Sequence, residues 1–287
     1  MLTTALFGIL MLVVIVIIHE CGHALVARIC GVGVAEFGVG FSKPRIKLFT
    51  IGNCPVYLCL WLLGGYVRLK ARDDKKSHGA GGTFIEDATL SRKIFIFAGG
   101  VLANLVSAVF LRMIIFIVAP HGVTFDFIYP MELGEAPVWY LIPAYAVYEV
   151  VVTFALWSFA MIIGIFIAIP VIIASIFSAT PAPGGGMIAT IGLGSAIHNS
   201  AWSYLAVVYY MSVVVAALNL IPLLPFDGGQ IVLAIVQKIL LRVFGEGRAY
   251  RIFTAVYRYS GLIFIGVLLV AVVMSDISDI IRFFGGK

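Results

Sequence analysis

The stretch LFGILMLVVIVIIHECGH (residues 6–23) joins an apolar run to a short motif of ionisable residues. The apolar part carries no charged side chain and ends directly in His19, Glu20 and His23. Ionisable side chains inside or at the edge of a membrane span are energetically unfavourable, so they indicate a functional site. On a helix, His19 and His23 lie one turn apart on the same face, where both can bind one Zn²⁺ while Glu20 reaches metal-bound water. The stretch therefore predicts a membrane helix that carries a hydrolytic zinc site.

The composition is that of a protein that crosses the bilayer several times. Of the 287 residues, 62% are hydrophobic and only 11% are charged, and the mean hydropathy is +1.11. These values exclude an ordinary soluble domain. The first apolar segment has neither a basic n-region nor a small-residue cleavage site, so we expect it to be retained. In such a chain the net charge of +5 reports topology, and we expect no nucleic-acid partner.

Five apolar stretches follow one another along the chain. Four of them have close to the ~20 residues that a bilayer core requires, and they are 2–25, 94–118, 203–225 and 259–275. The fifth stretch, 147–178, contains Glu149 near its start and Pro170 in its interior. Whether this fifth stretch crosses the membrane depends on the placement of the charges around it.

The charges are distributed unevenly between these stretches. Lys and Arg crowd 26–93 and 228–258, whereas 119–146 contains neither. The positive-inside rule then places the two basic regions in the cytoplasm and 119–146 outside. Stretch 147–178 must therefore cross an even number of times, and we expect it to be an interfacial or re-entrant element. Arg112, near the outer end of its span, has a side chain long enough to snorkel.

The region 32–72 has the pattern of strands and turns. Short runs of alternating apolar and polar residues are interrupted by glycines and prolines. Its segment YLCLWLL (57–63) is too apolar for an exposed hairpin, and strand backbone at membrane depth needs protein or a water-filled cavity around it. We expect a membrane-re-entrant β-hairpin that dips towards the zinc site and offers an edge to an unwound substrate. A peripheral hairpin anchored by Trp61 is the alternative.

The third zinc ligand is expected at Asp227, within NLIPLLPFDGG (219–229). It is the only carboxylate between Glu149 and Glu246, and the prolines and glycines around it break the helix, which can turn the carboxylate inward. Both Asp227 and the histidine pair fall at the cytoplasmic ends of their spans, so they can meet. Two His and one carboxylate with an open fourth position are typical of a catalytic zinc site. The alternative is an ordinary helix-end Asp and two hydrogen-bonded interfacial histidines.

Four motifs in order make the chain resemble the site-2 proteases, the intramembrane zinc metalloproteases of the peptidase M50 type. They are HECGH (19–23), LGGYVR (63–68), AGGVLAN (98–104) and NLIPLLPFDGG (219–229). The resemblance is greatest to the bacterial branch that cleaves anti-sigma factors and signal-peptide remnants. It covers most of 1–118 and 180–275.

Three departures from the family pattern stand out. Gly100 occupies the position of a family Pro, which we expect to alter only the local turn. Phe226 replaces a family Leu and leaves the Asp ligand intact. Members of that bacterial branch carry PDZ domains between the second and third core spans, but 119–202 is too apolar to be one. We therefore expect a member without a PDZ domain, in which 147–178 takes over part of the substrate gating.

The resemblance implies peptide hydrolysis at Zn²⁺ held by His19, His23 and Asp227, with Glu20 as general base and acid. The residues that it implies for substrate binding are Gly65, Tyr66, Asn104 and Asn219. For the two Asn side chains, hydrogen bonding between helices is an equally good interpretation. The implied substrate is a single-pass membrane protein, such as an anti-sigma factor or a signal-peptide-like helix.

We expect one intramembrane protease domain over 1–287, a polytopic α-helical membrane protein with about four core transmembrane helices. Its expected parts are 1–31 (first span with the zinc motif), 32–72 (membrane-associated hairpin region), 94–118 (second span), 119–202 (extracytoplasmic or interfacial insert), 203–230 (span with the Asp ligand) and 259–275 (last span). We expect a multi-pass protein of a bacterial inner or plasma membrane, with the active site towards the cytoplasm and in contact with the lipid bilayer.

Two other classes of function remain open at this point. A zinc transporter would distribute acidic residues and histidines along several spans, whereas here they converge at one depth. A catalytically silent membrane scaffold would not need the general base Glu20, which is intact.

Overall fold

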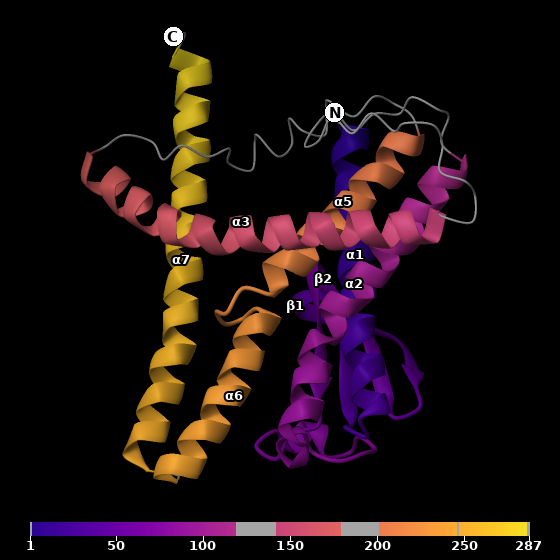
Figure 1. Cartoon of the computed structure of the whole chain (residues 1–287), viewed down its shortest axis with the longest axis vertical. Coiled ribbons are helices and arrows are strands. Elements are labelled where there is room, and N and C mark those ends of the chain that lie inside the picture. Colours follow the sequence, from indigo (N-terminus) through magenta and orange to yellow (C-terminus); the bar gives the residue numbers. More distant parts are fainter. Residues whose placement is uncertain (1, 119–141, 179–200, 246, 286–287) are drawn as a thin grey trace.

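The computed structural model describes residues 2–118, 142–178, 201–245 and 247–285 (Figure 1). Its helices are α1 (Leu2–Ile29), α2 (Leu90–Val118), α3 (Ile142–Ser178), α5 (Ala201–Asn219), α6 (Asp227–Phe244) and α7 (Arg248–Gly285). Two strands, β1 (Val34–Ile51) and β2 (Cys54–Leu69), and two short 3-10 turns, η1 (Lys75–Ser77) and η2 (Ile85–Asp87), lie between α1 and α2. The fold is thus a set of long apolar helices with one strand region inserted after the first.

Three helices of the described part are long and apolar enough to cross a membrane, at Leu10–Ile29, Leu90–Ile117 and Ile142–Met161. This supports a membrane protein, as the composition predicts. The apolar segment expected at 203–225 is wrong in extent, because the α5 helix ends at Asn219. Pro222 and Pro225 lack the backbone N–H that a continuing helix would need there.

Helices α1 and α2 pack against each other through small residues at the level of the histidine motif. A Cβ added at Gly22 would lie 2.2 Å from the Gly99 carbonyl oxygen, and one at Gly99 would lie 2.8 Å from the Gly22 carbonyl oxygen. Only glycine on both helices allows this close approach of the two backbones, as in the small-residue contacts of membrane helix pairs. The crossing places the histidine-bearing turn of α1 directly against α2.

The strands form the antiparallel hairpin that the sequence predicts, and it folds back on itself. The start of β1 pairs with the end of β2, from Val34 with Leu69 to Val39 with Gly65. The rest of β1 pairs with the start of β2, between 45–51 and 54–59. Segment 65–69 pairs only with β1 among the described residues, so it forms an edge. The hairpin contacts α1, and this edge lies next to it.

Helix α3 runs across α2 and α5 instead of lying parallel to them (Figure 1). It is continuous through Pro170, so the re-entrant alternative for 147–178, which needs a turn, is wrong. By length and composition its first part could cross a membrane. Arg112 does not snorkel: its side chain is buried between the helices and forms a two-point ion pair with Glu149 of α3, one contact being 3.0 Å long.

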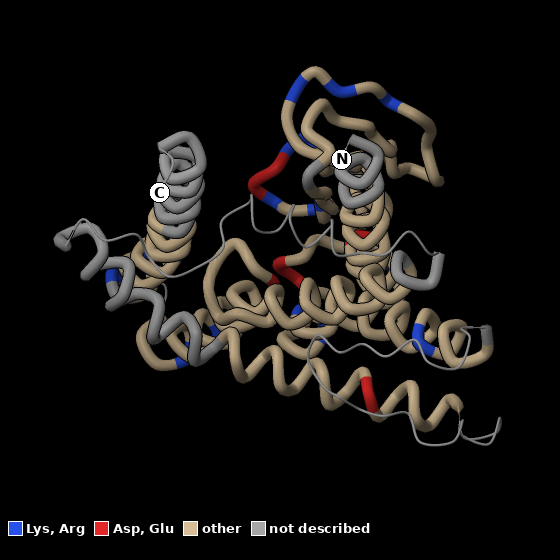
Figure 2. Tube along the Cα trace, turned by 90° about the horizontal axis from the view of Figure 1, so that it is seen from above, with Lys and Arg blue, Asp and Glu red and all other residues tan. Residues whose placement is uncertain are grey.

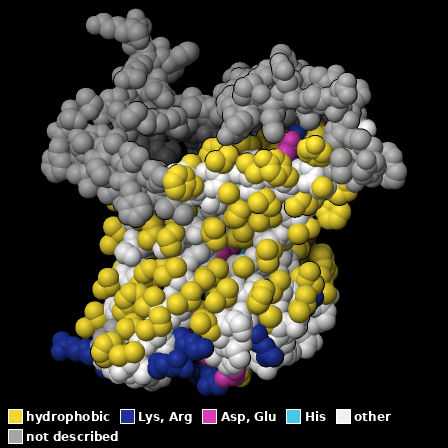
Figure 3. Space-filling view, viewed as in Figure 1, with side chains coloured by type: hydrophobic (Ala, Val, Ile, Leu, Met, Phe, Trp, Pro, Cys, Tyr) yellow, Lys and Arg dark blue, Asp and Glu magenta, His cyan; other side chains and the backbone are white. Residues whose placement is uncertain are grey.

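Basic side chains gather mainly at one end of the described structure, whereas the Arg112–Glu149 pair lies between α2 and α3. Figure 3 shows an apolar face over most of the height of the molecule and a band of Lys and Arg at the end where α6 meets α7. Viewed along the long axis, further basic positions follow the hairpin, which contains Lys43, Arg45 and Lys47 (Figure 2). The segment that leads into α2 and the junction of α6 and α7 lie at the same end (Figure 1). Of the insert 119–202, residues 119–141 and 179–200 lie outside the described part.

Candidate metal centre

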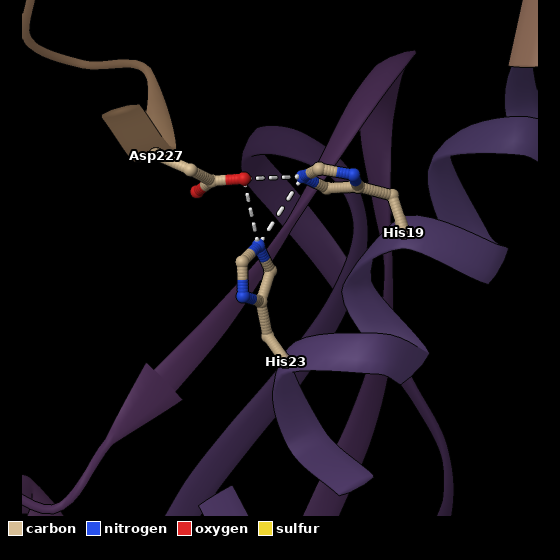
Figure 4. A group of neighbouring side chains, drawn as sticks. All are labelled: His19, His23 and Asp227. Carbon is tan, nitrogen blue, oxygen red and sulfur yellow. Dashed lines mark hydrogen bonds and ion pairs between the residues drawn. The ribbon is translucent and has the colours of Figure 1, made fainter. Parts of the chain in front are cut away.

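The structure brings His19 and His23 together with Asp227, which lies more than 200 positions further along the chain (Figure 4). The Asp227 Oδ2 atom lies 3.0 Å from His19 Nε2 and 3.2 Å from His23 Nε2. The two Nε2 atoms are 3.2 Å apart. Both histidines are buried, and the Asp227 side chain is 14% exposed. Three potential ligand atoms therefore converge on one point inside the protein.

The main chain explains how Asp227 reaches this point. Asp227 is the first residue of α6, where a carboxylate interacts favourably with the helix dipole. The turn 220–226 leads from α5 into it, and its backbone bonds are short-range ones such as Phe226 N–H to the Leu223 carbonyl. The sequence predicted an inward-turned carboxylate at the end of a span. The structure instead places the carboxylate at the start of the following helix.

The donor set fits a metal ion. The Nδ1 atom of His23 lies 2.8 Å from the Ile96 carbonyl oxygen, which can only accept, so Nδ1 carries the proton and a neutral His23 has its lone pair on Nε2. The Asp227 Oδ2 atom is buried without a hydrogen-bond donor. Ligands held at ~2.0–2.1 Å by a tetrahedral zinc ion are about 3.3 Å apart. The observed separations match this geometry and the chemistry of a His₂-carboxylate site.

Asn104 of α2 lies behind one of these histidines. Its side chain is fully buried, and its Nδ2 atom is 3.3 Å from His19 Nδ1. The Oδ1 atom has no hydrogen-bond partner. The resemblance assigned Asn104 to substrate or oxyanion binding, and the bundle-packing alternative assigned it to a bond between helices. In the structure Asn104 of α2 contacts His19 of α1. The contact therefore joins two helices, and one of its two residues is a candidate metal ligand.

Glu20 and the hairpin edge lie side by side next to the His–His–Asp group. A Cβ added at Gly65 would be 3.0 Å from Glu20 Cγ, and the Glu20 carboxylate is also close to the Val67 backbone. The same carboxylate interacts electrostatically with both histidines and with Asp227. Gly65 therefore lies next to the site. Glu20 therefore lies next to both the ligand group and β2 at Gly65.

Two of the residues predicted for substrate binding have other partners. The Tyr66 hydroxyl donates to the carboxylate of Glu36, which also pairs with Arg45, and this network lies away from Gly65, because neighbouring strand residues face opposite sides. Burial and then this hydrogen bond raise the pKa of Tyr66 to about 12. The Asn219 amide donates to the Val215 carbonyl of its own helix at 3.0 Å. The structure brings neither side chain to the ligand atoms.

Two further groups at the site escaped sequence reasoning. Gly100 was expected to affect only a local turn, but it lies inside α2, where an added Cβ would be 2.5 Å from Nε2 of both His19 and His23. The Gly99–Gly100 pair within a helical pattern was a usable signal, since glycine is unfavourable inside helices. The Ile96 carbonyl is a backbone group and leaves no signal in the sequence.

The fold and the site together define a class: helical membrane-associated proteins with a buried His₂-carboxylate centre beside a further carboxylate. Comparison with known proteins narrows this class. The model of peptidase family M50 matches residues 7–264. The chain therefore belongs to peptidase family M50, the family to which the site-2 proteases belong.

Individual relatives match a smaller part of the chain. A Helicobacter pylori protein named "Putative zinc metalloprotease" is 36% identical over 107 residues, which are 36% of this chain and 30% of that protein. The regulator of sigma-E protease RseP of Salmonella typhimurium is 33% identical over 111 residues, 38% of this chain and 25% of that protein. RseP of Escherichia coli is 32% identical over 111 residues, with the same coverage. The chain thus matches less than a third of the length of these relatives.

Proposed function

We propose that this protein is an intramembrane zinc metalloprotease that hydrolyses peptide bonds within or near the transmembrane segments of membrane-protein substrates. The observation that carries the proposal is the convergence of three ligand atoms at 3.0–3.2 Å, with Glu20 close to them and to Gly65 of β2. Membership of family M50 and relatives named as zinc metalloproteases support it.

The chemistry divides between the metal and this chain's residues. His19, His23 and Asp227 would hold Zn²⁺, which when bound polarises a scissile carbonyl and acidifies water. Glu20 is placed to take a proton from the attacking water and to pass it to the leaving amine. Gly100 and the α1–α2 crossing keep the imidazoles against α2, so the ligands are oriented before any substrate arrives.

The edge of β2 is the proposed binding place for substrate backbone. A substrate helix must unwind locally, because helical carbonyls are engaged in their own hydrogen bonds. An unwound segment could pair with residues 65–69, and the Gly65 end of this segment lies against Glu20. Gly65 lacks a side chain that would separate substrate backbone from Glu20. Binding by strand addition would therefore place the extended segment beside the proton-transferring carboxylate.

The substrate class rests on the family resemblance and the orientation rests on the charge pattern, and both belong to the proposal. We propose single-pass membrane proteins, such as anti-sigma factors or signal-peptide-like helices, as substrates, and a bacterial inner or plasma membrane as the location. The basic segment that leads into α2 and the basic junction of α6 and α7 lie at the same end, which supports a cytoplasmic position for that end (Figure 1). The histidine motif lies in the half of α1 that leads towards this end.

The decisive test is Glu20→Gln in the full chain, reconstituted with a reporter transmembrane helix. The amide keeps the shape of the side chain but cannot accept the proton, so cleavage should fall by at least the 10²–10⁴-fold typical of a lost general base, while zinc content stays the same. Glu86→Gln, at an acid in the turn η2, is the matched control and should cleave as wild type does. Full activity of the Glu20 variant would overturn the proposal.

A further inference from the structure

We infer that helix α7 positions the metal-ligand loop through Tyr257 and Gly261, so that these two residues set the location of Asp227. The inference rests on the proposed metal site. It concerns two residues outside the four family motifs, on a helix that supplies no ligand atom.

Tyr257 contacts the backbone both before and after Asp227. Its hydroxyl donates to the Pro222 carbonyl at 2.7 Å, and the Gly229 carbonyl lies 3.3 Å from the same oxygen. Pro222 belongs to the turn before Asp227, and Gly229 belongs to the first turn of α6 after it. One side-chain atom therefore spans the chain on both sides of the ligand.

Gly261, one helical turn after Tyr257 on α7, contacts the same turn. A Cβ added there would lie 2.1 Å from the Leu224 carbonyl oxygen and 3.0 Å from the Leu224 nitrogen. The backbones of α7 and the turn are thus in direct contact. Phe253, Tyr257 and Gly261 are spaced four residues apart and share one face of α7. The Phe253 ring stacks on Tyr257 with centroids 5.7 Å apart, which fixes the ring that carries the hydroxyl.

The turn has only short-range backbone hydrogen bonds of its own, such as Leu223 N–H to Ile221 and Phe226 N–H to Leu223. Pro222 and Pro225 have no N–H to donate, and Phe226, the residue that caps α6, makes no side-chain capping hydrogen bond. By contrast, His19 and His23 sit within the continuous helix α1 and are held from behind by α2. Of the three candidate ligands, Asp227 is the one that follows a non-helical turn instead of lying within a continuous helix.

The test compares two variants on this face with two matched controls on the same helix. Tyr257→Phe removes only the hydroxyl, and Gly261→Ala pushes against Leu224. Tyr259→Phe changes an exposed tyrosine, and Gly266→Ala adds a methyl group where no atom of the described residues lies within 4 Å. Each purified full-length variant is titrated with Zn²⁺ against a chromophoric chelator, and the visible spectrum of its Co²⁺ form reports the ligand geometry.

We expect Tyr257→Phe and Gly261→Ala to bind Zn²⁺ about 10-fold more weakly, the lower end of the range for residues that orient metal ligands, and to change the Co²⁺ spectrum. Without metal, Tyr257→Phe should have the melting temperature of the wild type. In both variants, the rise in melting temperature on adding Zn²⁺ should be smaller than in the wild type. In a reporter assay kcat should fall while KM stays constant. The two controls should behave as wild type does.

The outcomes separate this inference from the proposed function. Unchanged Zn²⁺ affinity and an unchanged Co²⁺ spectrum in Tyr257→Phe would overturn the role of α7, even if Gly261→Ala fails to fold. An equal loss of stability with and without metal would assign Tyr257 to packing alone and equally overturn it. If the wild-type protein itself bound no Zn²⁺, the proposed function would fall instead.

Discussion

Replacement of Asn104 tests whether the metal centre is oriented from behind by a hydrogen-bond acceptor. A histidine that binds metal through Nε2 carries its proton on Nδ1, so the group next to Nδ1 must accept. Asn104 Nδ2 lies 3.3 Å from His19 Nδ1, while the buried Oδ1 has no partner. The oxygen and nitrogen of an amide exchange places by a half-turn of the side chain. With Oδ1 turned to His19, both the acceptor and Nδ1–H are satisfied.

The structure sets the size of the effect. Asn104 is fully buried, so water cannot replace the lost acceptor in Asn104→Ala. Loss of such an orienting partner weakens metal binding by ~10–100-fold, or about 1.4–2.7 kcal/mol. Asn104→Asp keeps an acceptor and loses only the donor, so we expect it to bind Zn²⁺ within about 10-fold of wild type and more tightly than Asn104→Ala.

The assay is a Zn²⁺ competition titration of the detergent-solubilised protein at one fixed pH. Ser107→Ala is the control, because its hydroxyl bonds back to the Asn104 carbonyl within α2 and does not touch His19. The reasoning is refuted if Asn104→Ala binds Zn²⁺ as tightly as wild type. It is equally refuted if Asn104→Asp binds more weakly than Asn104→Ala, since His19 Nδ1 would then require a donor.

Three further predictions concern the rest of the site and its support. Asp227→Asn removes the ligand charge and should lower the zinc stoichiometry after purification; an unchanged stoichiometry would remove Asp227 as a ligand. Gly100→Ala places a methyl group against both imidazoles and should weaken Zn²⁺ binding in the same titration, whereas Gly79→Ala, in open space, should not. Arg112→Met leaves Glu149 buried without its partner and should lower unfolding stability by ~3–5 kcal/mol; adding Glu149→Leu should restore most of it in the same unfolding assay.

The sequence predicts those parts of the structure that depend on local pattern. The apolar run before His19 becomes α1, and the Gly-punctuated region 32–72 becomes the hairpin. The pairing of Asp227 with the histidines was also predictable, because a lone carboxylate in a long apolar region needs a partner. In each case the residue type limits the environment that the residue can occupy.

The remaining features depend on contacts that leave little trace in one sequence. Pro170 suggested a bend in 147–178, but the helix continues through it. The charge rule could not show that Arg112 is paired with Glu149 and not exposed, since that contact needs α3 to lie across α2. Tyr66 was chosen for its place in a motif, yet the alternation of strand faces turns it to Glu36.

The two halves of the metal centre are held in different ways, and this difference bears on how the site works. The histidines belong to a rigid unit, because α1 and α2 touch backbone to backbone at Gly22 and Gly99. Asp227 begins a helix that packs against α2 and α7 and follows a non-helical turn held by short-range backbone bonds. A metal ion bound by all three would therefore join α6 and α7 to the α1–α2 unit, and its binding free energy would stabilise that packing. A change that weakens the packing of α7 should therefore also weaken metal binding, because the two are linked.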